Sequence, residues 1–320
     1  MNVAVTRAGF QTTVQDLGRA GYRASGVSPG GALDPIALRV ANLLVGNDET
    51  AAGFEATLGT LRLRFDDDRL VAWCGGAFEV EIAGAKLRAG RQAFIRRGDE
   101  LRAAASANGA RAWFTISGGI DVPAVLGSRS TDVRSGFGGL DGRSLRDGDL
   151  LPLAAAKSLA RPAIVGWSAP EQWANTTRRH PYLRIVRGAD ASRFAEATLR
   201  LLVDEPFTVT QEADRMGVRL DGRKIDRADD EELLSEPVTP GTIQVPPDGK
   251  PIVLLGDCQT IGGYPKIAHV ITVDMPAAAQ LRAGDIVHFA EVSLADARRL
   301  YAERERDLAW FRAGVALRRR

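Results

Sequence analysis

Residues 61–82 read LRLRFDDDRLVAWCGGAFEVEI, and the pattern of apolar residues in this segment indicates the fold class. Apolar or alternating runs at 61–65, 70–74 and 78–82 are bounded by aspartates and glycines. Alternation of apolar with other residues is typical of a strand that turns one face toward a core. The stretch therefore predicts three successive β-strands.

The same pattern recurs along the rest of the chain. Further strands are expected at 92–95, 112–117, 182–186, 207–210, 242–245, 252–255, 268–273 and 286–292. The 34 glycines in 320 residues exceed the average share of about 7%. This content indicates many turns and close backbone approaches, and it favours a mainly β fold.

The sequence also predicts a few short helices. Asp34 can cap a helix that starts at Pro35, places Ile36 and Val40 on one face, and ends before Gly46. A second helix is expected at 192–203, because Pro206 prevents its continuation. A third should begin at the capping residue Ser293. It would turn these residues toward the core: Ala297, Leu300, Tyr301 and Leu308.

Length and an internal repeat indicate two domains. A chain of 320 residues corresponds to roughly two domains of about 150 residues. Similar turns at 97–99, 147–149 and 283–285 lie beside apolar runs, as two related β domains would explain, although chance turn chemistry would also do so. The Ala-rich segment 153–162 ends in proline and marks the boundary. We expect domains at 1–156 and 163–292, followed by a helix and basic tail at 293–320.

Composition excludes several classes of protein. With 42 basic and 40 acidic residues the net charge is only +2, so no chain-wide field indicates nucleic acid or a membrane as partner. Two cysteines and three scattered histidines match no metal-site spacing. No signal-peptide layout and no membrane-spanning run is seen, so a cytoplasmic location is expected. The end at 318–320 is interpreted as a solvated tail.

Familiar catalytic motifs are missing from the sequence. It has no phosphate-binding P-loop, dinucleotide-binding glycine turn, HExxH metal helix or GxSxG nucleophile elbow. It also lacks a Met-Lys-Met attachment site, so no covalent biotin is expected on this chain.

Polar residues gather instead in glycine-rich segments. In the first half, Gln15, Asp16 and Arg19 can face a small polar ligand, or they can satisfy the backbone of a loop. The loop 127–132 interleaves hydroxyls with Arg129, as in an anion-holding loop, but an ordinary turn rich in serine and threonine explains it equally well.

In the second half, the segments 214–220, 244–249 and 255–265 carry the polar residues. Asp257 follows an apolar strand and precedes a Gly-Gly turn, as residues of binding sites often do, or it simply pairs with Arg215. Cys258 has no basic neighbour in the sequence, so an inert thiol is expected.

Seven sequence segments, which follow one another in the same order as in a known family, resemble that family. They are TTVQDLGRAGY (12–22), GVSPGGALD (26–34), SGGIDVP (117–123), LGSRSTD (126–132), DRMGVRL (214–220), IQVPPDGKPIVLLGDCQTIGGYP (243–265) and IAHVI (267–271). Together they closely resemble the biotin-dependent carboxyltransferase-like family, which includes the KipA or allophanate hydrolase subunit 2 type. The resemblance spans roughly residues 3–289 and implies two tandem cyclophilin-like β-barrel domains. Ser28, Leu33 and Ile261 depart from residues frequent in the family and could tune substrate choice.

The resemblance also implies a function. The leading expectation is the C subunit of an ATP-dependent 5-oxoprolinase, a hydrolase that opens the 5-oxoproline lactam to glutamate together with a KipI-like B subunit and a LamB/YcsF-like A subunit. ATP would then bind with the partner subunits. One alternative is a carboxyltransferase subunit that moves a carboxyl group from carboxybiotin to urea or a related amide. Another is a KipA-like regulator that binds a KipI-like kinase inhibitor.

Site residues are carried over from the matching motifs. The residues expected to bind the amide substrate are Gln15, Asp16, Arg19, Ser130, Met216, Gln244, Gln259, Thr260 and Tyr264. Asp257 is the candidate to orient or deprotonate a reacting group, and Arg215 is the candidate to stabilise negative charge on the amide oxygen. Arg215, Asp257, Gln259 and Tyr264 are expected to line one pocket.

Overall fold

A computed structural model describes residues 1–156, 168–176, 182–227 and 233–318. The chain divides into two compact units. The first comprises the described residues within 1–20, 30–177 and 311–320, and the second those within 21–29 and 178–310. The predicted boundary at 153–162 falls partly on residues outside the described ranges.

The first unit contains two antiparallel sheets around one core. Their strands are β1 (Asn2–Ala8), β2 (Gln11–Gln15), β3 (Gly53–Thr57), β4 (Thr60–Phe65), β5 (Arg69–Gly75), β6 (Phe78–Ile82), β7 (Ala85–Lys86), β8 (Gln92–Ile95), β9 (Glu100–Ala105), β10 (Arg111–Ile116) and β11 (Leu150–Pro152). The orders are β11-β1-β4-β9-β6-β7 and β2-β3-β10-β5-β8. Buried residues of both sheets, such as Leu63 and Phe114, join one apolar cluster. The strands expected within 61–82 are therefore confirmed.

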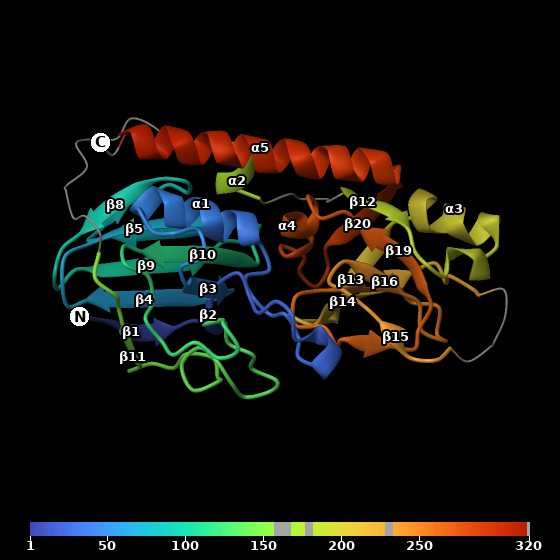
Figure 1. The fold of residues 1–320 in the computed structure, drawn as a ribbon, viewed down its shortest axis with the longest axis horizontal. Helices are drawn as coiled ribbons and strands as arrows, with labels where there is room; N and C mark the ends of the chain where they lie inside the picture. Colours follow the sequence, from blue (N-terminus) through green and yellow to red (C-terminus); the bar gives the residue numbers. More distant parts are fainter. Residues whose placement is uncertain (157–167, 177–181, 228–232, 319–320) are drawn as a thin grey trace. The chain divides into compact units, whose positions relative to one another are not determined.

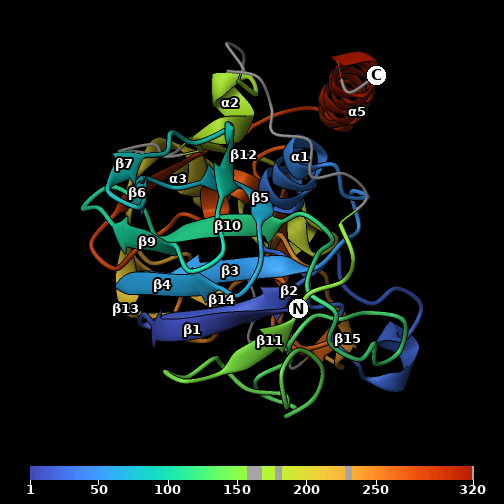
Figure 2. The ribbon, with the colours of Figure 1, turned by 90° about the vertical axis from the view of Figure 1, so that its left-hand side faces the viewer.

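Helix α1 (Pro35–Val45) covers the five-stranded sheet and contacts β5 and β10 (Figure 2). The Asp34 side chain accepts a hydrogen bond from the Ala37 N–H at 2.8 Å. Gly46 ends the helix in the left-handed conformation, with φ of 82°. Both predicted helix signals are confirmed.

The second unit is built on a closed seven-stranded barrel (Figure 1). Its strands, in barrel order, are β12 (Tyr182–Arg187), β19 (Lys266–Val270), β16 (Thr242–Gln244), β17 (Ile252–Leu254), β14 (Gly217–Gly222), β13 (Phe207–Ala213) and β20 (Ile286–Glu291). Only the β12–β20 pair is parallel among these described strands. A small sheet pairs β15 (Glu236–Pro237) with β18 (Ile261–Gly262). The mainly β architecture is thus confirmed.

The three similar turns have the same hydrogen bonds. Gly98, Gly148 and Gly284 all have φ near +90°. Gly284 donates to the Val209 carbonyl, and the Val209 N–H donates to the Asp285 carbonyl. In the same way, the Gly98 N–H donates to the Phe65 carbonyl, and the Phe65 N–H donates to the Asp99 carbonyl. The Gly148 N–H donates to the Val5 carbonyl, and the Val5 N–H donates to the Asp149 carbonyl. Each aspartate side chain also accepts from the N–H of an arginine three residues earlier: Arg96, Arg146 and Arg282. The internal repeat seen in the sequence is therefore also a structural repeat, and it is present in both units.

Some predicted boundaries were wrong. Strand β19 runs from Lys266 to Val270 rather than over 268–273. The sequence did not indicate the start of this strand, because a lysine is not expected at a buried strand position. In the fold Lys266 is buried and forms ion pairs with Asp190 and Glu236. Helix α3 (Glu196–Asp204) begins later than predicted, after a 3-10 turn at Ala191–Arg193. The other described helices are the short α2 (Glu171–Ala174) and α4 (Met275–Ala278), and a 3-10 turn covers Arg23–Ser25.

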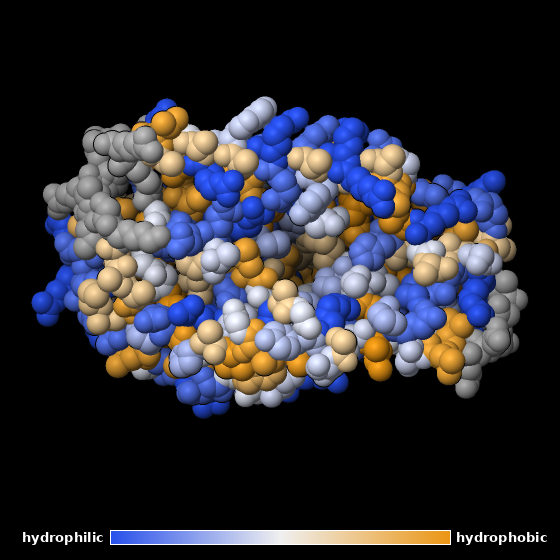
Figure 3. All heavy atoms as spheres, in the orientation of Figure 1, coloured by the Kyte–Doolittle hydropathy of each residue, from blue (hydrophilic) through white to orange (hydrophobic). Residues whose placement is uncertain are grey.

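The last helix, α5 (Leu294–Arg318), begins where Ser293 predicts, because the Ser293 hydroxyl accepts from the Asp296 N–H at 3.0 Å. Leu308 is buried as expected. Tyr301 is 47% exposed, so its predicted place in the core is wrong; its ring lies against the Arg304 guanidinium instead. Arg318 belongs to the helix, whereas 319 and 320 lie outside the described residues. Hydrophilic and hydrophobic residues are interspersed along α5 (Figure 3).

Candidate functional site

A pocket of about 580 Å³ opens beside the barrel of the second unit. The described residues that line it are Gln211, Glu212, Ala213, Asp214, Met216, Gly217, Arg219, Gln244, Ile252, Leu254, Gln259 and Tyr264. Four of them, Met216, Gln244, Gln259 and Tyr264, belong to the predicted set. The structure therefore brings together residues from three separate sequence segments.

Irregular strand pairing shapes this pocket. The register between β13 and β14 shifts between Val209 and Ala213, and that between β16 and β19 shifts at Gln244. Such shifts turn side chains away from regular alternation and are frequent next to functional sites. They explain how Gln211 and Glu212 reach the pocket. No sequence signal marked these two residues, because the shift depends on the partner strand.

Two glutamine side chains form the polar wall. Gln244 is 1% exposed, and its Nε2 donates to the Tyr264 carbonyl at 3.2 Å. Gln259 Nε2 lies 3.4 Å from Gln244 Oε1. An added Cβ on Gly262 would lie 2.8 Å from Gln244 Nε2, so a larger residue at this position would displace the amide. The pair offers amide groups, which both donate and accept hydrogen bonds.

Arg215 and Asp257 face each other. Arg215 Nε and Nη2 donate to the two carboxylate oxygens of Asp257 at 2.7 and 2.9 Å. Both side chains are buried, and the Asp257 N–H also donates to the Arg215 carbonyl. Neither residue, nor Thr260, is among the described lining residues of the pocket. The geometry matches the alternative in which this pair joins two segments of the pocket wall.

The charges around the pocket do not fit a polyphosphate. Asp214 accepts from the N–H groups of Met216 and Gly217, at 2.7 and 3.1 Å, and so shapes a turn. Arg219 pairs with Glu212 at 2.8 Å. The charged lining residues are thus two carboxylates and one arginine that is already paired. This pocket does not suit the triphosphate of ATP, which needs several donors and cations.

The first-unit candidates form a separate cluster around Asp16. Its carboxylate accepts from the hydroxyls of Ser128 and Ser130, both at 2.6 Å, and from the N–H groups of Gly18 and Arg129, at 2.8 and 2.6 Å. Asp16 is only 8% exposed. The hydroxyl-rich loop therefore holds an anion, and that anion is the protein's own Asp16.

Gln15 and Arg19 are also engaged within this cluster. Gln15 Nε2 donates to the Thr13 hydroxyl and the Thr131 carbonyl. Arg19 donates to the Ser130 carbonyl and lies over the Phe137 ring. Both side chains are buried. These contacts favour the structural alternative for the first-unit candidates.

The thiol of Cys258 is buried, and burial raises its pKa to about 11, although Arg23 lies near enough to oppose the shift. A neutral thiol of this kind is a poor nucleophile, as the sequence predicts. Within the described ranges, no group of three or more His, Cys, Asp or Glu side chains is arranged to hold a metal. In the same ranges, no helix is both long and apolar enough to cross a membrane.

Comparison with known proteins identifies the family. Residues 25–291 match the carboxyltransferase domain family, subdomains A and B. The chain belongs to this family. This carboxyltransferase-domain chain is 41% identical to the 5-oxoprolinase C subunit of Escherichia coli strain K12, over 96% of its own length and 97% of the relative's. Identity to the 5-oxoprolinase C subunit of Haemophilus influenzae is 35%, over 92% and 93%.

The fold of this carboxyltransferase-domain chain also matches a solved structure. The crystal structure of the K. lactis urea amidolyase superposes with a TM-score of 0.88 at 30% identity. The match covers 95% of this chain but only 19% of the urea amidolyase chain. In that protein the matched region is therefore one part of a much longer polypeptide.

Proposed function

We propose that this chain is the C subunit of a 5-oxoprolinase, a hydrolase that works as a complex of several subunits. One observation carries the proposal: 41% identity to the E. coli subunit of that name, over nearly the whole length of both chains. A match of this extent includes both structural units. By contrast, the urea amidolyase contains the matched region as a fifth of its chain.

The reaction would open the 5-oxoproline lactam to glutamate. A water oxygen bonds to the lactam carbonyl carbon, the C–N bond breaks, and the nitrogen takes up protons to become the ammonium group. Gln244 and Gln259 suit this substrate, because their amides can accept from the lactam N–H and donate to its carbonyl. Apolar Leu254 and Met216 can contact the ring methylenes, and Tyr264, a further lining residue, is 43% exposed.

Asp257 and Arg215 were candidates for general base and oxyanion stabiliser. Both carboxylate oxygens of Asp257 already accept from Arg215. We therefore propose that the pair positions the loop that carries Gln259, rather than acting on the substrate directly. A general base must lie within hydrogen-bond reach of the proton that it takes up, and Asp257 is not among the described residues that line the pocket.

The complex would contain a KipI-like B subunit and a LamB/YcsF-like A subunit, with ATP as co-substrate. The charges around the second-unit pocket are unsuited to a triphosphate, which supports an ATP site on the partner subunits. Fusion of the matched region to other parts in urea amidolyase supports a need for partners.

Carboxyl transfer from carboxybiotin to urea or a related amide is the second candidate. The TM-score of 0.88 to urea amidolyase favours it. Two assays on the same purified mixture of A, B and C subunits separate the candidates. Glutamate from 5-oxoproline and ATP is the expected product. Carboxylated urea from free carboxybiotin, without glutamate, would favour the second candidate. A stable complex without either turnover would favour the KipA-like regulatory role.

A further inference from the structure

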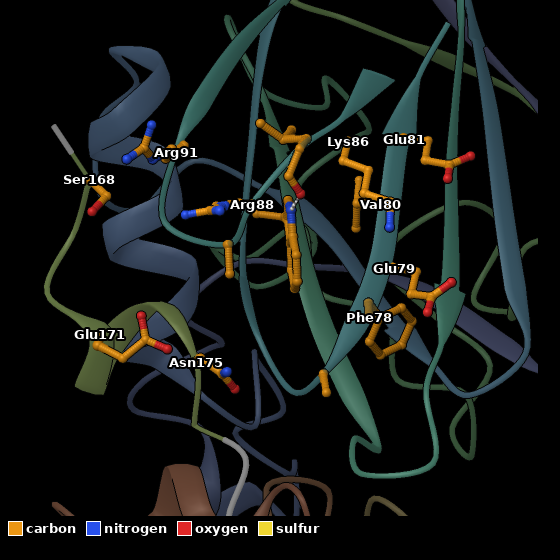
Figure 4. A pocket seen from close by; sticks show the side chains of 14 residues that line it. Phe78, Glu79, Val80, Glu81, Lys86, Arg88, Arg91, Ser168, Glu171 and Asn175 are labelled. Carbon is orange, nitrogen blue, oxygen red and sulfur yellow. Dashed lines mark hydrogen bonds between the residues drawn. The ribbon is translucent and has the colours of Figure 1, made fainter. Parts of the chain in front are cut away.

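A second pocket, of about 500 Å³, lies in the first unit (Figure 4). Its walls are β5, β6, the segment 86–91 and the segment 168–175 that contains α2. Its volume falls within the range typical of small-molecule sites. None of its lining residues belongs to the site described above.

The floor of this pocket is apolar and fixed. Trp73, Phe78, Val80 and Leu87 line it. The Trp73 indole donates from Nε1 to the Leu87 carbonyl at 3.1 Å, and its ring stacks on Phe114 with centroids 6.0 Å apart. Trp73 is only 4% exposed and Phe78 7%, so these fixed side chains offer a ligand a small apolar contact area with little loss of side-chain entropy.

The wall formed by α2 is held at one end by the segment 86–91 and at the other by β5. The Ala169 N–H donates to the Gly90 carbonyl at 2.8 Å, and the Thr176 N–H donates to the Gly75 carbonyl at 3.1 Å. Gly90 has φ of +70°, and a Cβ added there would lie 2.5 Å from the Ala174 Cβ. Only glycine permits this close packing, so the wall is an integral part of the unit.

Charges of both signs surround the apolar floor. Lys86, Arg88 and Arg91 line the pocket, as do the carboxylates Glu79 and Glu171. None of these five has an ion pair within the described residues. Figure 4 shows Arg88, Arg91 and Glu171 on the α2 side of the pocket, and Lys86 and Glu79 on the β6 side. Glu81, a further lining residue, instead lies 3.6 Å from Arg102.

We propose that this pocket binds a small zwitterion with an apolar body, such as an α-amino acid with an apolar side chain. A simple anion would face Glu79 and Glu171 as well as the cations, and a simple cation would face Lys86, Arg88 and Arg91. A zwitterion pairs its carboxylate with the basic side chains and its ammonium group with a carboxylate. Its apolar body then contacts the exposed part of the apolar floor. This inference does not depend on the proposed function.

Titration calorimetry on the full chain tests the proposal, with L-phenylalanine and L-leucine as probes. At least one should bind with 1:1 stoichiometry. N-acetyl-L-phenylalanine, which lacks the ammonium group, and phenethylamine, which lacks the carboxylate, should each bind at least about tenfold more weakly. The double variant Arg88→Gln/Arg91→Gln and the variant Glu171→Gln should each weaken amino-acid binding by about tenfold or more.

Arg64→Gln is the matched control, because Arg64 is exposed on β4 and does not line the pocket. It should leave binding unchanged. The proposal is overturned if neither amino acid binds at about 10 mM. It is equally overturned if the analogues with one charge bind as well as the amino acid, or if the Arg88/Arg91 and Glu171 variants bind like the control.

Discussion

The pair formed by Arg215 and Asp257 shows how a plausible catalytic carboxylate can have a structural partner. Two short, charge-assisted hydrogen bonds join the side chains, and both are buried. A third bond, from the Asp257 N–H to the Arg215 carbonyl, fixes the same two segments at the backbone. The pair therefore joins two chain segments, and Gln259 follows Asp257 by two residues.

Asp257→Asn tests this role. The variant keeps the size of the side chain but removes the charge, so we expect a loss of about 1–3 kcal/mol in the free energy of unfolding. Turnover by the assembled complex should fall by less than the roughly 100-fold expected for loss of a general base. Its pH profile should stay unchanged. A larger fall in turnover with stability intact would make Asp257 a catalytic residue.

Asp149 gives the molecule a pH-dependent contact. Arg143 donates to both of its oxygens, at 2.8 and 2.9 Å, and lowers the pKa of this carboxyl below its ordinary value. The stabilisation is thus fully present above the pKa of the unfolded chain and is lost as pH falls through the lower folded value.

We therefore expect Arg143→Gln to reduce the melting temperature at pH 7, and the difference from the parent protein to shrink as the pH falls below about 4. Thermal unfolding followed by circular dichroism at several pH values measures this. Arg64→Gln, at a position without an ion pair within the described residues, should show no such trend. A constant difference for Arg143→Gln across the pH range would contradict the assignment.

At the scale of elements, the repeated turns explain part of the glycine content. Gly284 has φ of +89°, and an added Cβ would meet nothing within 4 Å. Gly284→Ala should therefore destabilise through backbone strain alone, by about 1–2 kcal/mol. Gly314→Ala in α5 is the matched control, because it also meets nothing within 4 Å and has no positive φ.

In that exposed helical position alanine should stabilise by up to about 1 kcal/mol. Urea unfolding of both variants measures the two effects. Equal changes of the same sign in the free energy of unfolding of the two variants would show that the conformation of the turn at 282–285 has no energetic cost for alanine.

The sequence predicted several strands whose core-facing residues are large and apolar, but not all of them: β1 was missed although Val3 and Val5 are buried, and β3 was missed although Phe54 is buried. In β6, Phe78, Val80 and Ile82 are buried and the glutamates between them are not, and the pattern was clear. Strand β9 was missed because Leu101 and Ala103 are its only fully buried residues. Strand β14 was missed because its glycines and charged residues resembled a polar loop.

The candidate site was predictable in part for a related reason. The motifs located Met216, Gln244, Gln259 and Tyr264, which the fold brings to one pocket. Gln211 was not predictable, because it reaches the pocket through a register shift between two strands. For Asp16, sequence alone left open whether the loop holds a ligand or the protein's own carboxylate. The hydrogen bonds from Ser128 and Ser130 favour the second.

At the scale of the whole molecule, both units belong to one functional subunit. The match to the 5-oxoprolinase C subunit of E. coli extends over 97% of that relative. The proposed amide-binding pocket lies in the second unit, and the proposed zwitterion pocket lies in the first. We propose that this chain completes a 5-oxoprolinase.

The most direct test is the initial rate of glutamate formation from 5-oxoproline and ATP, measured while this chain is added to fixed amounts of its A and B partners. We predict no glutamate without the chain, and a rate that rises with added chain and saturates when the subunits reach a fixed ratio. A rate independent of the chain, or no glutamate at any ratio in a mixture that forms a stable complex, would contradict this role of the chain.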